Sequence, residues 1–339
     1  MKILLVRPEG IGDQIVSLPV AAELRRTFPQ AKIFFLSSVL AAPVLEQHPD
    51  LDGVVTVSGR ERFADLVSLF RQGFDVVIFL KPFRRLIAAA WAARIPIRVA
   101  TGYRWYSVLT NRRVYEHRSD FSKHEVEYNV NLLKGLGLTP RRPDPPRLFL
   151  SEEERRWAKA KLGGLPRPCV LLHPGGRCTR HWKPPHYWTL AQQLAEQGMG
   201  VVFTGTAEEG EEFRKDTGLS GAMPAPILDW TGMLTLRELL AVIGESQAVV
   251  CGSTGPGHIA AALNVPTVSL IDPRRSSIPT RWGPLGPGKI LMPDVPTCER
   301  CIYEACPYWD CLDRISVEQV VSAVREVAGA TRVLSVLHA

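Results

Sequence analysis

The stretch LLVRPEGIGDQIVSLP, residues 4–19, decides how the chain begins to fold. An apolar run leads into a loop with Gly10 and Gly12, Asp13 follows at once, and an apolar-periodic segment continues from Ile15. A strand, a glycine loop and a helix in this order are typical of the first unit of a parallel α/β sheet. Glycine loops at this place often bind phosphate, but the carboxylate of Asp13 would repel one. We therefore interpret Asp13 as a general base toward a hydroxyl, as the N-cap of the helix, or as both.

The same alternation of strand-like and helix-like segments continues along the chain. Before residue 137 it predicts strands at 2–6, 32–38, 53–58 and 75–80, helices at about 14–27 and 61–72, and a short helix at 42–49. After residue 150 it predicts strands at 169–174, 200–205, 226–229, 248–252 and 267–272, and helices at 151–162, 184–197, 207–217, 235–244, 254–263 and 316–328. Because apolar residues fill these strands without alternation, they predict parallel sheets covered by helices on both faces.

A proline- and arginine-rich segment, residues 137–150, interrupts this pattern as a linker would. The predicted fold class is therefore α/β, with two Rossmann-like doubly wound domains, 1–145 and 146–339, that face each other across a cleft. Ligands of such sheets bind beyond the carboxyl ends of the strands. We expect the terminal helix to pack back toward the N-terminal domain.

The composition is that of a soluble globular protein, with 45% hydrophobic and 22% charged residues over 339 residues. The opening apolar run is too short for a signal peptide. The apolar, uncharged stretch at residues 86–93 is far shorter than the roughly 20 residues that span a bilayer. The sequence therefore predicts a cytoplasmic protein.

Positive charge is concentrated in the first half of the chain. Residues 1–150 hold 22 Lys and Arg against 14 Asp and Glu, while residues 151–339 hold 19 against 20. Nine of the basic residues and a single acid, Glu116, fall within 81–118, with aromatic side chains such as Trp105 among them. This pattern predicts a solvated basic face or a surface for an anionic partner; nucleic acid, a phosphorylated sugar and acidic lipid headgroups all fit it.

Two loops of the second half have the composition of phosphate sites. The first follows the strand 169–174 and combines a glycine turn with cations, which together suit a diphosphate. Its candidate residues are Gly175, Gly176, Arg177, Arg180 and Lys183. The alternative is an ordinary strand-to-helix turn with a charged loop. A Walker loop is excluded because its spacing of glycines and lysine is absent.

The second loop follows the strand 248–252 and leads directly into an alanine-rich helix. Small residues at a helix N-terminus leave its N–H groups open to an anion, which the helix dipole also favours. Its candidate residues are Ser253, Thr254, Gly255, Pro256 and His258. The alternative is that Thr254 only caps the helix and His258 only packs in its first turn. The two loops together predict a pocket for a nucleotide diphosphate in the C-terminal domain.

Four cysteines are clustered near the end of the chain as C-x2-C-x4-C-x4-C, at Cys298, Cys301, Cys306 and Cys311. Four thiols at short spacing suit zinc or an iron–sulfur cluster. The x4 spacings are looser than those of the best zinc motifs, so we expect loop cysteines, reduced or partly disulfide-bonded, with a metal cluster as the alternative.

Several ordered motifs resemble the ADP-heptose:lipopolysaccharide heptosyltransferases, glycosyltransferase family 9. The likeness rests on the opening ILLVRPEGIGDQIVSLPVAAELRRTFPQAKI, on LLHPGG…RHWKPPHYWTLAQQL, on DWTGMLTLRELLAVI and on STGPGHIAAALNVPT. The late cysteine-rich segment and the helix after it extend the likeness over nearly the whole chain.

The resemblance implies a GT-B fold, with the acceptor bound by the N-terminal domain and the donor by the C-terminal one. It implies an inverting transfer from an ADP-sugar, with Asp13 as base on the acceptor hydroxyl and no cofactor or metal required. Asp229 falls where a contact to the nucleotide ribose is expected. The acceptor would be an anionic, lipid-linked glycan at the inner face of the cytoplasmic membrane, bound through Gly10, Gly12, Arg84, Arg85 and Arg104.

Two departures from the family pattern bear on the donor. Arg180 stands where many members have lysine, which keeps the positive charge. Ser253 stands where many members have an aspartate that is thought to contact the donor sugar. Because this chain has no carboxylate there, the identity of the donor sugar stays open. A transferase for another nucleotide sugar, a nucleotide-sugar epimerase and a non-catalytic nucleotide- or RNA-binding protein are the alternatives. A dehydrogenase is disfavoured because no G-x-G-x-x-G follows the first strand.

Overall fold

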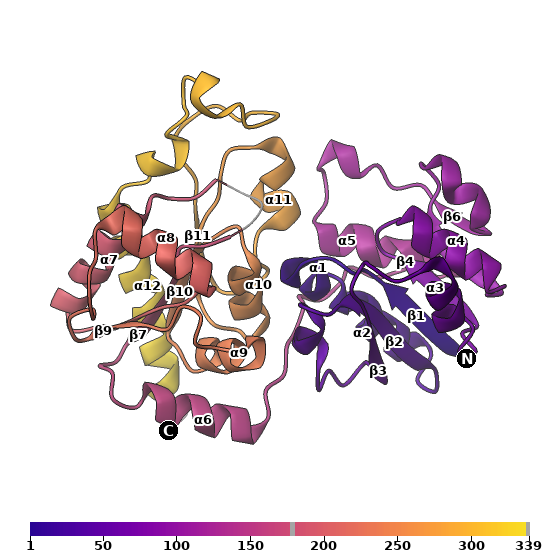
Figure 1. Cartoon of the computed structure of the whole chain (residues 1–339), viewed down its shortest axis with the longest axis horizontal. Coiled ribbons are helices and arrows are strands. Elements are labelled where there is room, and N and C mark those ends of the chain that lie inside the picture. The colour runs from indigo at the N-terminus through magenta and orange to yellow at the C-terminus, as the bar shows by residue number, and fades with distance from the viewer. Residues whose placement is uncertain (177–179, 337–339) are drawn as a thin grey trace. The chain divides into compact units, whose positions relative to one another are not determined.

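The computed structural model describes residues 1–176 and 180–336, with the backbone alone for 330–336. The chain divides into two compact units, Met1–Phe149 and Leu150–Ala339, and each holds one six-stranded sheet (Figure 1). Every strand pairs in parallel with its neighbours. The predicted class of two doubly wound α/β units is therefore confirmed, with the division close to the boundary expected after residue 145.

The sheet of the N-terminal unit has the strand order β3-β2-β1-β4-β5-β6. Its strands are β1 (Lys2–Val6), β2 (Lys32–Ser38), β3 (Gly53–Val57), β4 (Val76–Phe79), β5 (Ile97–Thr101) and β6 (Arg112–Val114). Residues Ile3 to Val6 of β1 are all buried, because helices cover both faces of the sheet. The chain winds outward in one direction from β1 and in the other from β4, so a topological switch point lies between these two strands.

The helices of this unit are α1 (Ile11–Ile15), α2 (Leu18–Thr27), α3 (Phe63–Phe70), α4 (Arg84–Ala92) and α5 (Glu125–Val130). Short 3-10 helices are η1 (Ala42–Leu45), η2 (Trp105–Leu109), η3 (Arg118–Asp120) and η4 (Asn131–Leu136). The single helix expected at 14–27 is in fact α1 and α2. Pro19 lies in the first turn of α2 and has no N–H to donate to the carbonyl of Ile15, so the helix is interrupted before it.

The sheet of the C-terminal unit has the order β12-β11-β10-β7-β8-β9, with its switch point between β7 and β10. Its strands are β7 (Cys169–His173), β8 (Gly200–Phe203), β9 (Ile227–Asp229), β10 (Ala248–Gly252), β11 (Thr267–Leu270) and β12 (Gly288–Leu291). Its helices are α6 (Glu152–Leu162), α7 (Pro184–Glu196), α8 (Ala207–Thr217), α9 (Leu236–Gly244), α10 (Gly255–Ala262), α11 (Pro279–Trp282) and α12 (Val317–Val336). Further 3-10 helices are η5 (Arg275–Ser277), η6 (Tyr303–Ala305) and η7 (Cys311–Arg314).

The terminal helix α12 continues beyond the expected end at residue 328. Its described side chains pack within the C-terminal unit, against α7 and the strands β10, β11 and β12. Val320 and Val324 are fully buried there, so the first half of α12 is part of the core of this unit. None of the described helices combines the length and the apolar character that a bilayer span needs.

Candidate active site

The loop after β1 holds Asp13 at the third position of α1. Gly10 is the N-cap of this helix and has an extended backbone, with no side chain to cap it. Asp13 therefore does not take the N-cap position that was one of its two expected roles. Its Oδ1 instead accepts a hydrogen bond of 2.5 Å from Nη2 of Arg7, and its side chain remains 25% exposed.

This loop lies at the switch point of its sheet, where ligands of doubly wound folds bind. β1 pairs with β4, so the residues that follow the two strands are neighbours. Glu9, from the loop after β1, forms an ion pair with Lys81, which follows β4. The parallel sheet thus places the partly exposed carboxylate of Asp13 at the edge where ligands of this fold class bind.

The basic region 81–118 is not one uniform charged surface. Arg98 and Arg113 donate to backbone carbonyls, those of Leu109 and Ser107 among them. Arg118 bonds the buried Glu125. These three arginines therefore have a structural role, because the hydrogen bonds of each one fix a loop or a helix of the N-terminal unit.

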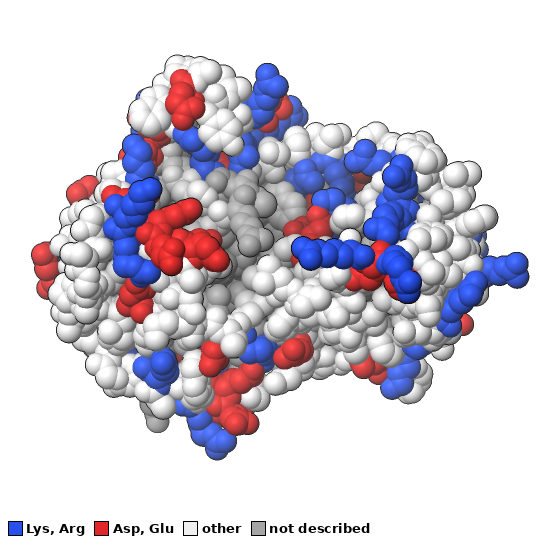
Figure 2. Space-filling model, in the orientation of Figure 1, with Lys and Arg blue, Asp and Glu red and all other residues white. Residues whose placement is uncertain are grey.

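The expected acceptor residues of this region differ in their contacts. Arg85 donates to the carbonyl of Glu61 at 2.6 Å. The side chains of Arg84 and Arg104 make no hydrogen bond or ion pair within the described part of the chain, and both residues are exposed. In Figure 2 several Lys and Arg side chains of the N-terminal unit gather on the face shown. Arg84 and Arg104 are the two candidates whose charge is free for a ligand.

In the C-terminal unit the two predicted loops meet at the switch point between β7 and β10. Gly176 has φ of +151°, which side chains rarely adopt, and an added Cβ would lie 2.5 Å from Cγ2 of Thr254. The same Cβ would lie 3.0 Å from Cε1 of His181. Only glycine fits here, because the turn after β7 passes directly against the residue that begins α10.

Thr254 is the N-cap of α10, but its side chain makes no capping hydrogen bond to the helix. Pro256 in the first turn has no N–H, and the N–H groups of Gly255 and Gly257 lie too close to the helix start to have an i−4 acceptor within the helix. Gly257 is buried, and an added Cβ would lie 3.0 Å from Sγ of Cys251. The small residues thus let α10 pack closely on β10 while its N-terminus stays suited to an anion.

Gly175 lies against a carboxylate. A Cβ added at Gly175 would lie 2.2 Å from the carboxyl carbon of Glu209, the third residue of α8, whose side chain accepts from the N–H of the N-cap Thr206. The carboxylate of Glu209 would repel a phosphate there, so the N-terminus of α10 is better suited to an anion than this turn. His173 is buried at the end of β7, 3.1 Å from Thr204 Oγ1, and burial lowers the pKa of its imidazole although Glu209 acts in the opposite direction.

The other expected donor residues already have protein partners. Asp229 forms an ion pair with Arg214 and accepts from the N–H of Thr231 at 3.0 Å. Arg180 donates to the carbonyl of Trp309, and Nζ of Lys183 lies 2.9 Å from Asp313. Both therefore hold the segment 303–313. Arg177 lies outside the described residues.

The four late cysteines line one cavity of about 40 Å³, together with Arg180, Asp272 and Arg274. All four are free thiols. Burial raises the pKa of Cys298 and that of Cys311. Among the described residues, no group of three or more His, Cys, Asp or Glu side chains has the arrangement of a metal site.

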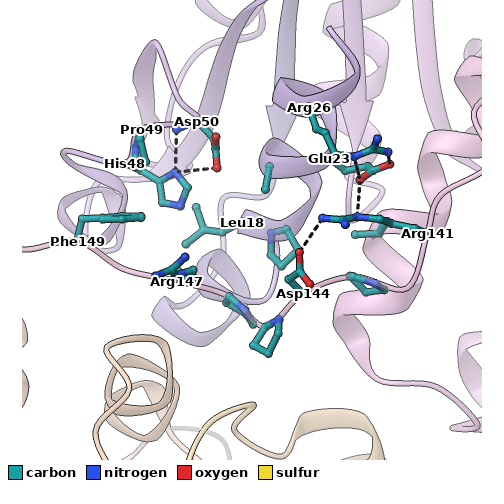
Figure 3. A pocket seen from close by; sticks show the side chains of 16 residues that line it. Leu18, Glu23, Arg26, His48, Pro49, Asp50, Arg141, Asp144, Arg147 and Phe149 are labelled. Carbon is teal, nitrogen blue, oxygen red and sulfur yellow. Dashed lines mark hydrogen bonds and ion pairs between the residues drawn. The ribbon is translucent and has the colours of Figure 1, made fainter. Parts of the chain in front are cut away.

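A larger cavity of about 320 Å³ lies in the N-terminal unit, between α2 and the linker (Figure 3). Leu18 and Phe149 contribute apolar surface, and His48 packs edge-to-face on Phe149. Arg141 is bonded to Asp144 at 2.7 Å on its rim. None of the residues expected to bind donor or acceptor lines this cavity, so it is separate from the candidate site.

The comparisons with known proteins agree with this geometry. Residues 64–308 match glycosyltransferase family 9 (heptosyltransferase). The chain belongs to this family. It is 28% identical to a putative glycosyltransferase of Haemophilus influenzae over 84% of this chain and 86% of that protein. It is 27% identical to lipopolysaccharide heptosyltransferase 2 of Escherichia coli over 80% and 83%.

Among solved structures, that of E. coli ADP-heptose lps heptosyltransferase II matches with a TM-score of 0.82. The identity is 25%, and the match covers 98% of this chain and 100% of that chain. The resemblance and the fold class expected from the sequence are thus confirmed. The chain is a glycosyltransferase, which decides against the epimerase and the non-catalytic binding protein.

Proposed function

We propose that this glycosyltransferase moves a heptose from ADP-heptose to the inner core of a lipopolysaccharide, with Asp13 as general base. The observation that carries the proposal is the carboxylate of Asp13, partly exposed at the switch point of its sheet. The names of the E. coli relatives, lipopolysaccharide heptosyltransferase 2 and ADP-heptose lps heptosyltransferase II, support the choice of substrates.

In the proposed reaction an acceptor hydroxyl gives its proton to Asp13 while its oxygen bonds to the anomeric carbon of the heptose. The bond between that carbon and the diphosphate oxygen breaks on the opposite face, and ADP leaves with the electron pair. The configuration at the anomeric carbon is therefore inverted. Asp13 is suited to the role because its Oδ2 accepts no hydrogen bond from the described residues.

The donor is proposed to bind the C-terminal unit. The diphosphate would be held by the start of α10, through backbone N–H groups and the helix dipole. The candidate residues there are Ser253, the N-cap Thr254, and Gly255, Pro256 and His258 of the first turn. Gly176 would let the diphosphate approach from the neighbouring turn. Gly175, Arg177, Arg180, Lys183 and Asp229 remain candidates, of which Arg180, Lys183 and Asp229 would exchange a protein partner for the donor. These groups would carry the charge of ADP without a metal.

The acceptor is proposed to bind the N-terminal unit, at Gly10, Gly12, Arg84, Arg85 and Arg104. The neighbouring helix η2 exposes 78% of Trp105 and 67% of Val108. Arginines beside exposed apolar side chains suit the surface of an anionic bilayer, in which the lipid-linked acceptor would be anchored. We therefore include a peripheral contact with the inner face of the cytoplasmic membrane in the proposal.

Ser253 supports one second candidate, a transferase with the same base and acceptor side but another nucleotide sugar. The hydroxyl of serine lacks the charge of the carboxylate that many family members have at this position. Such a site would fit a donor sugar whose hydroxyls need fewer hydrogen bonds from the protein than those of heptose.

The proposed base is tested by comparing Asp13→Asn with the wild type in acceptor-dependent release of ADP from ADP-heptose. Asp65→Asn is a matched control, because Asp65 occupies the same third position of α3 and lies outside the site. We expect Asp13→Asn to lose more than about a hundredfold in kcat while Asp65→Asn retains wild-type kcat. Wild-type activity of Asp13→Asn would contradict the proposed role.

A further inference from the structure

Arg7 is a buried charged residue at the end of an apolar strand. It directly follows β1, its side chain is 3% exposed, and Asp13, Glu125 and Glu9 surround its guanidinium. Burial lowers the pKa of Arg7, but the three carboxylates raise it above the ordinary value. A buried cation is therefore kept charged by acids that come from the loop after β1, from α1 and from α5.

Both Nη atoms of the Arg7 guanidinium have hydrogen-bond acceptors. Nη2 donates to Oδ1 of Asp13 at 2.5 Å, and Nη1 donates to Glu125 at 3.0 Å and to Asn129 at 3.1 Å. Nε lies 3.1 Å from Oε2 of Glu9, without the alignment of a hydrogen bond. The planar fork of Arg7 thus has a fixed orientation, and with it the carboxylate of Asp13.

Glu125 and Asn129, which accept hydrogen bonds from Arg7, have further hydrogen-bond partners. Arg118 donates to Glu125 at 2.5 Å and to Asn129 at 3.1 Å. Asn129 in turn donates to the carbonyl of Val16, which ends α1, at 3.1 Å. Helix α5 therefore fixes both the guanidinium and the far end of the short helix that carries Asp13.

The three carboxylates differ in their access to solvent. Glu125 is 1% exposed, while the side chain of Asp13 is 25% exposed. Asp13 is bound to Arg7 through Oδ1, and its Oδ2 has no hydrogen bond from the described residues. The network is buried on the side of Oδ1, and Oδ2 is the oxygen left for a ligand.

We propose that Arg7 is a positioning residue for Asp13, and that Glu125 and Asn129 fix Arg7 in turn. This inference rests on the proposed role of Asp13 as base. Arg7 holds Oδ1, so that Oδ2 faces the acceptor hydroxyl in one orientation of the carboxylate. Without Arg7 the carboxylate of Asp13 rotates among several orientations, and the fraction of bound acceptors that are ready to lose a proton falls.

The test compares kcat and KM for the wild type, Asp13→Asn, Arg7→Lys and the double variant Arg7→Met/Glu125→Gln. The double variant removes one cation and one anion, so it leaves no added net charge in the buried network. We expect its kcat to fall about a hundredfold, with both KM values within about threefold of wild type. Arg7→Lys, which keeps a cation without the planar fork, should be intermediate.

Glu116→Gln is the matched control for loss of a buried ion pair. Glu116 is 8% exposed, bridges Lys123 and Lys134 in the same unit, and has no recorded contact with Asp13. We expect it to lower the melting temperature and to leave kcat unchanged. If the double variant does not fold, Glu125→Gln alone replaces it, with an expected loss of about tenfold in kcat at unchanged KM.

The outcomes separate this inference from the proposed function. If Asp13→Asn is inactive while the double variant, or Glu125→Gln in its place, keeps wild-type kcat, Arg7 does not position the base and only the inference is overturned. If Asp13→Asn keeps wild-type kcat, the proposed base is wrong and the inference fails with it. Loss of kcat in Asp13→Asn and in the double variant, with partial activity in Arg7→Lys, supports both.

Discussion

Gly176 illustrates how much of the candidate donor site depends on one missing side chain. The turn after β7 reaches Thr254 only because Gly176 has φ of +151° and no Cβ. The sequence identified Gly176 and Thr254 as candidates for one pocket, and the structure brings them into contact. Their common function as a donor site is still a proposal.

Gly176→Ala should therefore weaken donor binding. The added methyl group would meet Thr254 and force an unfavourable backbone conformation, which costs about 1–3 kcal/mol. We expect the Kd for ADP, measured by calorimetry, to rise at least about tenfold. Gly164→Ala is the control, because a Cβ at Gly164 has no neighbour within 4 Å, and its Kd should be that of the wild type. An unchanged Kd in Gly176→Ala would remove this turn from the donor site.

Arg7 and Glu125 show what the sequence does not reveal about single residues. A lone arginine after an apolar strand is a weak signal of a buried charge. Glu125 lies far from Arg7 along the chain, and no local pattern connects the two. Their 3.0 Å contact arises only after the sheet and α5 have formed, so only Asp13 itself could be predicted from the motif.

The regular elements were predicted where apolar periodicity was uninterrupted, and missed where charge was mixed into it. The region 84–114 contains α4, β5 and β6, but it is rich in arginine, which conceals the pattern. Leu86, Ile87 and Ala90 of α4 are nevertheless buried against the core. Arg98 and Arg113 extend from this core to bond backbone carbonyls, a role that composition alone does not indicate.

The linker after η4 is tied to the N-terminal unit at His48. Nδ1 of His48 accepts a hydrogen bond from the N–H of Asp50 at 3.3 Å, and the imidazole ring of His48 packs on Phe149 of the linker (Figure 3). Burial lowers the pKa of His48 below 6.5, although Asp50 and the backbone of Arg147 act in the opposite direction. The unfolded chain therefore binds a proton near pH 6.5 that the folded chain still excludes.

The stability of the protein should consequently depend on His48 at mildly acidic pH. The free energy of unfolding that comes from the neutral, buried His48 is fully present above pH 6.5. It is lost as the pH falls below 6.5, because the unfolded state then binds more protons than the native state. We expect the melting temperature to fall less between pH 7 and 5.5 in His48→Asn than in the wild type. His117→Asn, at an exposed histidine, should follow the wild type. Identical profiles for all three proteins would refute the prediction.

The helix η2 should act as the contact with anionic bilayers. Exchanging Trp105 and Val108 for serine removes the exposed apolar surface and leaves the arginines in place. We expect the double variant to sediment several-fold less with vesicles that contain anionic phospholipid, because apolar insertion and charge act together. Trp309→Ser, at an exposed tryptophan of the other unit, should bind as the wild type does. Equal binding of all proteins would show that η2 is not the contact.

The whole chain consists of two units of the same architecture with different charge. The N-terminal unit carries most of the excess of basic residues, while residues 151–339 are nearly neutral. Each unit places candidate residues at the switch point of its own sheet: Asp13 follows β1, which pairs with β4, and Gly176 and Thr254 follow β7 and β10. The order of strands and helices was sufficient to predict this architecture. The donor sugar depends on individual contacts such as that of Ser253, which the order of elements does not determine.

The most direct measurement is mass spectrometry of the acceptor after incubation with the wild-type enzyme and a panel of nucleotide sugars. The panel contains ADP-heptose and ADP- and UDP-hexoses, and the acceptor is a deacylated lipopolysaccharide core that lacks heptose. We expect the acceptor to gain the mass of one heptosyl residue with ADP-heptose, and Asp13→Asn to form less than about a hundredth of this product at the same enzyme concentration. A gain of a hexosyl residue, with no product from ADP-heptose, would contradict the heptose assignment.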